Sequence, residues 1–160
     1  MPVAEAEDAV GALRLRLDPS AALGVPAHVT ILVPFAPLDE VDEDALIDLL
    51  KAHRAFDFTL DRVEWFDDGV VYLSPEPAGP FAELTQAVAA RWPDYPPYEG
   101  VFDEVVPHLT VAWSDDRAAL DAAAAAIAKR VPIECRAREL LLLEQETRDG
   151  AWSTRRRFVL

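Results

Sequence analysis

The order of apolar and polar residues switches between helical and strand periodicity along the chain. In residues 5–18, Val10, Leu13 and Leu17 recur at helical spacing, with acidic residues in the first turn and arginines later. Residues 56–66 alternate with a period of two, and Asp-Asp-Gly at 67–69 predicts a hairpin to residues 70–76. The same patterns predict helices over 5–18, 42–56, 79–92 and 114–130, and strands over 28–33, 56–66, 70–76, 108–113, 133–146 and 151–160. We therefore expect an α+β fold.

The predicted elements occur twice in the same order. Each half consists of a strand with His-x-Thr, a helix, a long strand, a turn ending in Asp-Gly and a short strand. The halves cover residues 18–76 and 93–160, and the helix over 79–92 links them. This weak internal duplication predicts one domain, residues 1–160, made of two lobes.

The first strand of each half carries a histidine and, two residues later, a threonine. His28 and Thr30 stand in "HVTI", and His108 and Thr110 stand in "HLTV". Side chains alternate along a strand, so each pair shares one face while its apolar neighbours share the other. If the halves pack about a pseudo-two-fold axis, both pairs face one cleft. Two imidazoles there can act as general base and general acid near neutral pH, and two hydroxyls can donate hydrogen bonds to phosphate oxygens.

Two other interpretations of these pairs stay open at this point. Each histidine can simply satisfy a hydrogen bond within its sheet. A metal site has less support, because the two histidines have no adjacent third ligand at a recognisable spacing. We expect no metal ion and no cofactor.

Composition narrows the choice of partner and compartment. The chain of 160 residues has a formal net charge of −14, which disfavours an extended contact with nucleic acid but not a small anion held in a pocket. Cys135 is the single cysteine, so no intramolecular disulfide forms, and we expect it to be a buried strand residue. No run of 18 apolar residues occurs, and the first residues are acidic where a signal peptide would be basic. A cytoplasmic monomer without membrane contact is the expectation.

Aromatic and basic residues outside the motifs provide candidate substrate contacts. Tyr98 and Phe102 lie in the proline-rich loop over 93–107, where they can stack on a base or pack the loop onto the sheet. Arg156, in the run of arginines at 155–157, can reach a phosphate or protect a solvated edge strand. His53 is expected on the surface of its helix. Tyr98, Phe102 and Arg156 are the candidates that we retain.

The paired motifs "HVTI" and "HLTV" resemble those of the two-histidine phosphoesterase superfamily, which includes the bacterial 2′-5′ RNA ligases and RNA 2′,3′-cyclic phosphodiesterases. The resemblance covers nearly the whole chain, and the flanks "GVPAHVTILVPF" and "YPPYEGVFDEVVPHLTVAW" contribute to it. It implies a bilobal fold of duplicated βαββ-like units, with antiparallel sheets enclosing a central cleft and helices on the outside. It also implies that His28 and His108 are catalytic and that Thr30 and Thr110 bind the phosphate.

The resemblance suggests a metal-independent phosphoesterase that hydrolyses a 2′,3′-cyclic phosphate on a nucleotide or an RNA end. Three alternatives remain: 2′-5′ ligation of RNA, a nucleotide-binding module without turnover, and a structural protein. Two features depart from the family pattern. Only "MPVA" precedes the acidic helix where relatives have a full apolar strand, and Trp113 and Ser114 stand where some relatives have a basic residue.

Overall fold

The protein is described by a computed structural model that covers residues 1–67, 69–102, 104–147 and 149–160. Within these ranges helices and strands are mixed along the chain, as expected for an α+β protein. The elements are η1 (Ala4–Ala6), α1 (Glu7–Leu17), α2 (Pro19–Ala22), η2 (Leu38–Glu40), α3 (Glu43–Leu50), β1 (Phe56–Phe66), β2 (Val70–Glu76), α4 (Gly79–Arg91), η3 (Pro97–Gly100), β3 (Leu109–Trp113), α5 (Arg117–Ile127), β4 (Ile133–Ala137), β5 (Glu139–Gln145) and β6 (Trp152–Val159).

The larger sheet has the strand order β3-β2-β1-β4, and every neighbouring pair in it is antiparallel. It curls into a half-barrel because β1 and β3 each carry an irregularity in their pairing with β2, and bulges of this kind increase the local bend and twist. β1 and β2 come from the first half of the sequence, whereas β3 and β4 come from the second. One sheet thus joins strands from both halves.

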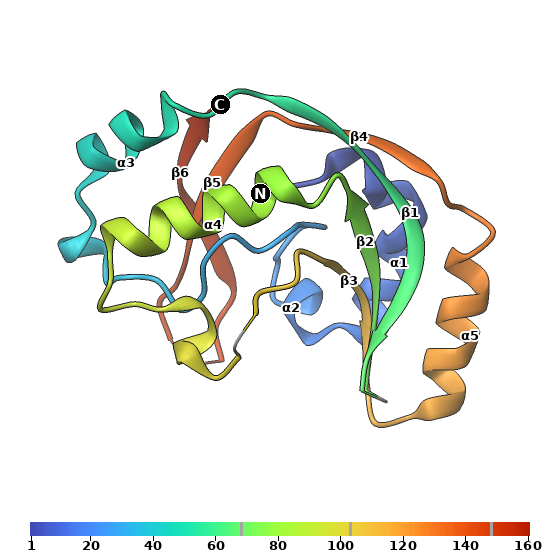
Figure 1. Cartoon of the computed structure of the whole chain (residues 1–160). Helices are drawn as coiled ribbons and strands as arrows, with labels where there is room; N and C mark the ends of the chain where they lie inside the picture. The colour runs from blue at the N-terminus through green and yellow to red at the C-terminus, as the bar shows by residue number, and fades with distance from the viewer. Residues whose placement is uncertain (68, 103, 148) are drawn as a thin grey trace.

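The smaller sheet is the antiparallel hairpin of β5 and β6. In Figure 1, β1, β2 and β3 stand on the right, β5 and β6 stand on the left, and α4 crosses in front between the two sheets. α5 covers the outer right side, next to the large sheet. The two sheets therefore stand apart, with chain segments passing between them.

The core lies on one face of the large sheet. Leu60, Leu73, Leu109 and Val111 are fully buried there, in a single cluster with apolar residues of α1, α4 and α5. Burial of each such side chain stabilises the fold by about 1.5–3 kcal/mol, so it determines which face of each strand points into the core. The opposite face of the same strands carries both polar and aromatic side chains, among them Thr110 and the buried Tyr72, which pair directly.

Several predicted elements agree closely with the structure. β1 and β2 have the predicted ranges 56–66 and 70–76, and α4 differs from its prediction by one residue. The other helices are shorter than predicted, because the flanking residues form turns and caps. Asp42 and Asp116 cap α3 and α5 by accepting backbone N–H groups. Asp68 and Arg148, which belong to the two predicted turns, and Asp103 lie outside the described residues.

Two predicted strands are wrong. The segment 133–146 is divided at Arg138, so that β4 joins the large sheet and β5 joins the small one. Residues 28–33 form no strand, and His28 makes only an isolated bridge to Pro2. For these reasons the expected duplication of two βαββ-like units is not confirmed. Among the residues that the structure describes, no helix has the length and apolar character needed to cross a membrane.

Candidate active site

His108 stands immediately before β3, on the polar face of the large sheet. Leu109 and Val111 point into the core, while Thr110 pairs directly with Tyr72 of β2. The imidazole of His108 contacts the ring of Phe66 edge-on at 4.8 Å and the ring of Tyr72 at 5.5 Å. The alternation of the strand therefore places His108 and Thr110 on one face, over an aromatic floor.

This floor is built by cross-strand pairing. Phe66 and Tyr72 stack at 4.1 Å with an interplanar angle of 21°. The Tyr72 hydroxyl donates to Oε2 of Glu64 at 2.9 Å, and burial together with this bond raises the pKa of Tyr72 to about 12. Tyr72 therefore stays protonated and its ring stays in place beside His108. The sequence analysis missed Glu64, Phe66 and Tyr72, since their approach depends on the register of three strands.

His28 is held by backbone bonds rather than by a strand. The Val29 N–H donates to the Met1 carbonyl at 2.9 Å, and the Val3 N–H donates to the Ala27 carbonyl at 2.8 Å. The Ala27 N–H donates to a carboxylate oxygen of Glu7 at 2.6 Å. The residues on both sides of His28 are thus fixed, and the short segment "MPV" supplies the pairing expected of a longer strand.

A buried ion pair fixes the chain just before His28. Arg14 of α1 is 2% exposed and donates to the Asp18 carboxylate at 2.9 and 3.1 Å. Arg14 also donates to the Val25 carbonyl at 3.3 Å, while Asp18 accepts the backbone N–H and hydroxyl of Ser20. Two buried charges are tolerated because the surrounding hydrogen bonds satisfy them. The sequence signal for this pair is the spacing of four residues on the apolar side of a helix.

Both motif histidines make the same hydrogen bond to the backbone. Nδ1 of His28 lies 2.8 Å from the Pro26 carbonyl oxygen, and Nδ1 of His108 lies 2.7 Å from that of Val106. In both cases the acceptor is two residues upstream. A carbonyl can only accept, so Nδ1 carries the proton and Nε2 has the free lone pair. Each imidazole therefore has Nε2 free to take up or deliver a proton.

Burial lowers the pKa of both imidazoles. The pKa of His28 falls to about 4, mainly because desolvation disfavours the charged ring and secondly because of the nearby Met1 amino group, although the Pro26 carbonyl opposes this effect. The pKa of His108 is also lowered by burial, with the Val106 carbonyl acting in the opposite direction. Both rings are consequently neutral at pH 7 in the free protein.

Tyr98 connects the loop before His108 to the first motif. Its backbone N–H donates to the Val33 carbonyl at 2.6 Å, and its phenol is hydrogen-bonded with the Thr30 side chain. Tyr98 and Glu99 have positive φ angles of 51° and 57°, a left-handed turn that costs non-glycine residues energy. This turn brings the loop against Thr30. Burial raises the pKa of Tyr98, and the bond with Thr30 lowers it.

Phe102 packs edge-on against Tyr98 with the ring centroids 5.6 Å apart, yet its side chain remains 60% exposed. Tyr98 and Phe102 thus form one aromatic pair beside Thr30. Their predicted contact with substrate stays a prediction.

The two motifs are not in direct contact. Among the described residues no hydrogen bond or ring contact joins His28 to His108, and Tyr98, in the loop before His108, contacts Thr30 and Val33 of the first segment. Arg156 lies elsewhere, in a pocket between α3 and β6 that neither motif histidine lines. Within the described ranges, no three His, Cys, Asp or Glu side chains gather in a way that could hold a metal ion.

A family model described as 2′-5′ RNA ligase superfamily matches residues 2–149. The chain belongs to this superfamily. The 2′-5′ RNA ligase superfamily is the two-histidine phosphoesterase superfamily, so the resemblance based on "HVTI" and "HLTV" is confirmed. Membership supports a phosphoesterase or RNA ligase-like activity on RNA or a nucleotide. No curated protein matches the chain significantly.

Proposed function

We propose that the protein hydrolyses a 2′,3′-cyclic phosphate on a nucleotide or an RNA end, with His28 and His108 as the acid–base pair. The observation that carries this proposal is the identical tethering of Nδ1 in both histidines, at 2.8 and 2.7 Å. It leaves two Nε2 atoms with the same chemistry, each followed two residues later by a threonine hydroxyl. Superfamily membership supports the reaction class.

The reaction needs one imidazole of each protonation state. Nε2 of the base takes a proton from water as the water oxygen forms a bond to phosphorus. The bond from phosphorus to one ribose oxygen breaks, and Nε2 of the acid protonates that oxygen. The product is a phosphomonoester beside a free ribose hydroxyl. Thr30 and Thr110 donate to the non-bridging oxygens, where charge increases in the transition state.

The environments of the two histidines favour His28 as the base. His28 is more strongly held by buried backbone contacts, and its pKa of about 4 makes the neutral ring the stable form. A bound phosphate anion raises the pKa of a nearby imidazole, which favours the protonated form of His108 in the complex. His108 is then the acid that protonates the departing oxygen.

A substrate with a good leaving group tests this assignment. A 4-nitrophenyl phosphodiester of a nucleoside needs little help from an acid, because 4-nitrophenolate leaves unprotonated. We expect His108→Ala to retain most activity on this ester but to lose at least about a hundredfold on a 2′,3′-cyclic nucleotide. His28→Ala should lose activity on both substrates. Equal losses on both substrates for His108→Ala would contradict its role as the acid.

Ligation is the second candidate, because the family model itself is described by a 2′-5′ RNA ligase activity. In ligation a ribose 5′-hydroxyl replaces water as the nucleophile, and the same acid and base serve. Incubation of RNA with a 2′,3′-cyclic end and RNA with a 5′-hydroxyl separates the two activities. A longer RNA with a new 2′-5′ bond would indicate ligation. RNA of unchanged length whose end carries a phosphomonoester in place of the cyclic phosphate would indicate hydrolysis.

A further inference from the structure

A pocket of about 810 Å³ lies between α3 and β6, away from the motif histidines. Its lining comes from two segments about a hundred positions apart in the sequence, the end of α3 and the last strand. The lining residues are Ile47, Leu50, Lys51, His53, Arg54, Thr154, Arg155, Arg156, Arg157, Phe158, Val159 and Leu160. Its volume is within the range of pockets that take small ligands, roughly 300–1,000 Å³.

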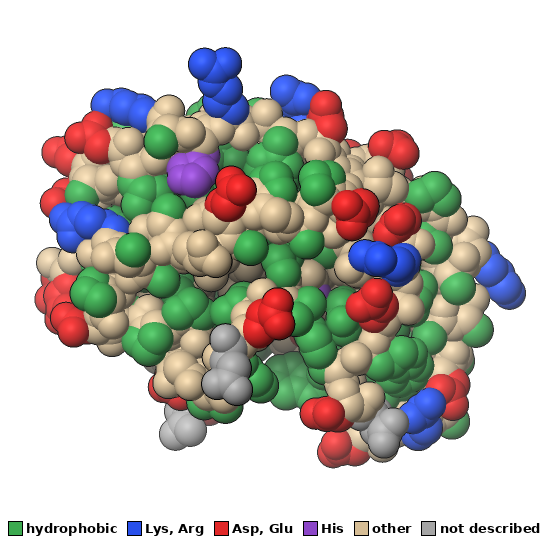
Figure 2. All heavy atoms as spheres, viewed as in Figure 1, with side chains coloured by type: hydrophobic (Ala, Val, Ile, Leu, Met, Phe, Trp, Pro, Cys, Tyr) green, Lys and Arg blue, Asp and Glu red, His purple; other side chains and the backbone are tan. Residues whose placement is uncertain are grey.

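The lining is positively charged in a strongly acidic protein. The chain has 15 Lys and Arg residues and a net charge of −14, yet five of the twelve lining residues are Lys or Arg and none is Asp or Glu. The upper edge of the face in Figure 2, where α3 and the C-terminus lie in Figure 1, also carries several Lys and Arg side chains. A pocket lined by one sign of charge attracts ligands of the opposite sign.

The basic side chains retain the capacity to bind a ligand. Four of the five basic residues already have one carboxylate partner: Arg155 pairs with Glu144, Arg156 with Glu43 at 3.3 Å, Arg157 with Glu139 at 2.8 Å and Lys51 with Asp48 at 2.6 Å. These acids lie outside the lining. The Lys51 side chain is 70% exposed and that of Arg156 is 54% exposed. A guanidinium has five N–H donors, so one carboxylate partner leaves others for a phosphate. Among the described residues, Arg54 has no hydrogen bond or ion pair.

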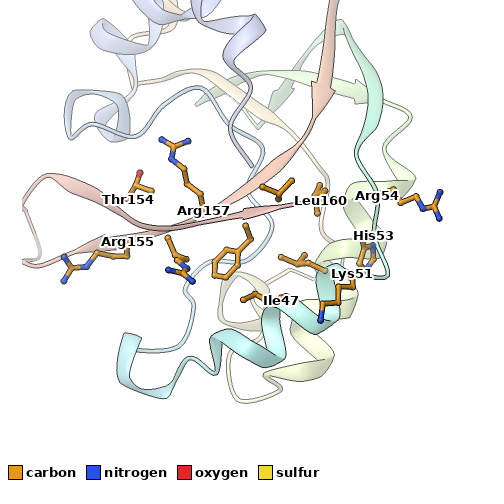
Figure 3. A pocket seen from close by; sticks show the side chains of 12 residues that line it. Ile47, Lys51, His53, Arg54, Thr154, Arg155, Arg157 and Leu160 are labelled. Carbon is orange, nitrogen blue, oxygen red and sulfur yellow. The ribbon is translucent and has the colours of Figure 1, made fainter.

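The positive groups are divided between the two ends of the pocket. Figure 3 shows Arg155 and Arg157 on β6 at one end, with the Arg157 side chain on the side of the strand away from Ile47, and Lys51, His53 and Arg54 beyond α3 at the other end. Ile47 lies between the two groups, and the buried side chains of Leu50 and Phe158 complete an apolar floor. This arrangement matches a ligand with an anionic group at each end and a less polar middle.

We propose that this pocket binds a ligand of nucleotide size that carries two separated phosphate groups. One phosphate lies on Arg155 and Arg156 of β6, and the other lies on Lys51 and Arg54. The sugar and base of such a ligand cover Ile47. The pocket is separate from the two-histidine site, so this proposal does not depend on the proposed phosphoesterase activity.

Calorimetric titration at about 0.1 M salt tests the proposal with three probes that differ only in phosphate number: adenosine 3′,5′-bisphosphate, adenosine 5′-monophosphate and adenosine. The protein carries His28→Ala and His108→Ala, so that the phosphate probes report on the pocket. We expect the bisphosphate to bind at least about tenfold more tightly than the monophosphate, because one additional charge-assisted contact contributes about that factor. Adenosine should show no binding.

Three charge variants locate the binding. Arg156→Gln and Lys51→Gln each remove one positive charge from the pocket, and we expect each to lower the affinity for the bisphosphate by about five- to tenfold. Arg16→Gln is the matched control, because it removes one charge from the exposed side of α1 and should change binding less than twofold. Thermal unfolding of each variant checks that its fold is retained, as expected for exposed side chains.

Three results would overturn the proposal. Equal affinity for the monophosphate and the bisphosphate would show that the two ends do not act together. An equal loss in Arg16→Gln and Arg156→Gln would show that net charge alone governs the binding. Absence of heat for the bisphosphate, confirmed by unchanged amide resonances of β6 on addition of the probe, would show that the pocket holds no such ligand.

Discussion

Protonation of His28 should destabilise the fold as the pH falls below 6.5. An exposed histidine in the unfolded chain has a pKa near 6.5, whereas burial lowers the pKa of His28 to about 4 in the fold. Between these two values the unfolded chain binds a proton that the folded protein does not. The stability contributed by the neutral ring is therefore complete above pH 6.5 and is lost progressively as the pH falls towards 4.

The size of this effect follows from the difference between the two pKa values. A tenfold change in proton affinity corresponds to ~1.4 kcal/mol, so the full difference amounts to roughly 3 kcal/mol, of which about 2 kcal/mol is already lost at pH 5. This is a large fraction of the stability of a small domain, which is typically about 5–15 kcal/mol. The effect should be measurable by urea unfolding.

His28→Asn isolates the contribution of this one ring. Asparagine does not titrate, and its amide N–H can replace Nδ1 as a donor to the Pro26 carbonyl. We expect the free energy of unfolding to fall between pH 7 and pH 5 by about 2 kcal/mol less in the variant than in the wild type. The other titrating groups are common to both proteins and cancel in this difference, apart from the Met1 amino group, whose charge lowers the pKa of His28 and whose own pKa of about 5 lies in the same range. The same fall in both proteins would refute the argument that His28 is buried as a neutral ring.

Three further predictions concern the ion pair before His28, the pH dependence of catalysis and the threonines. Arg14→Met should destabilise the protein by about 3–5 kcal/mol in urea unfolding, because it leaves the Asp18 carboxylate buried without its partner. Adding Asp18→Leu should restore part of this loss, and no recovery would argue against the ion pair as the cause. The optimum of kcat/KM on a 2′,3′-cyclic nucleotide should lie below pH 6.5, since burial lowers both histidine pKa values in the free enzyme. The optimum of kcat should lie at higher pH, because the bound phosphate stabilises imidazolium. An optimum of kcat/KM above pH 7 would contradict these shifts. Thr30→Ala and Thr110→Ala should each reduce kcat/KM by about tenfold, the value of one neutral hydrogen bond of ~1.4 kcal/mol, and a loss equal to that of a histidine variant would show a different role.

The local sequence pattern predicts correctly those elements whose regular alternation of apolar and polar residues matches the burial of their two faces in the fold. β1 alternates over its whole length and is followed by Asp-Asp-Gly, so its limits and those of β2 could be predicted to the residue. The segment 28–33 looks like a buried strand because it is β-branched and apolar. Among the described residues its one bridge is to Pro2, since the pairing partner is the very short segment at residues 1–3.

The remaining features depend on contacts between distant parts of the chain. The segment 133–146 is uniform enough in sequence to be one strand, but its two ends pair with different strands, and the chain changes sheet at Arg138. Arg14 has the spacing of a core residue in α1, but a charged side chain is not expected in a core. It is buried there because Asp18 is buried with it as an ion-pair partner. The pairs at His28 and His108 were predicted as candidates, whereas the aromatic floor under His108 required the register between β1, β2 and β3.

The central claim is that one activity depends on both motif histidines acting as a unit. The most direct measurement is kcat/KM on a 2′,3′-cyclic nucleotide for wild type, His28→Ala, His108→Ala and the double variant. We predict that each single variant loses at least about a hundredfold, and that the double variant loses little more than either single one, because removing one member already disables the pair. Hydrolysis by the double variant at the wild-type rate would contradict the account.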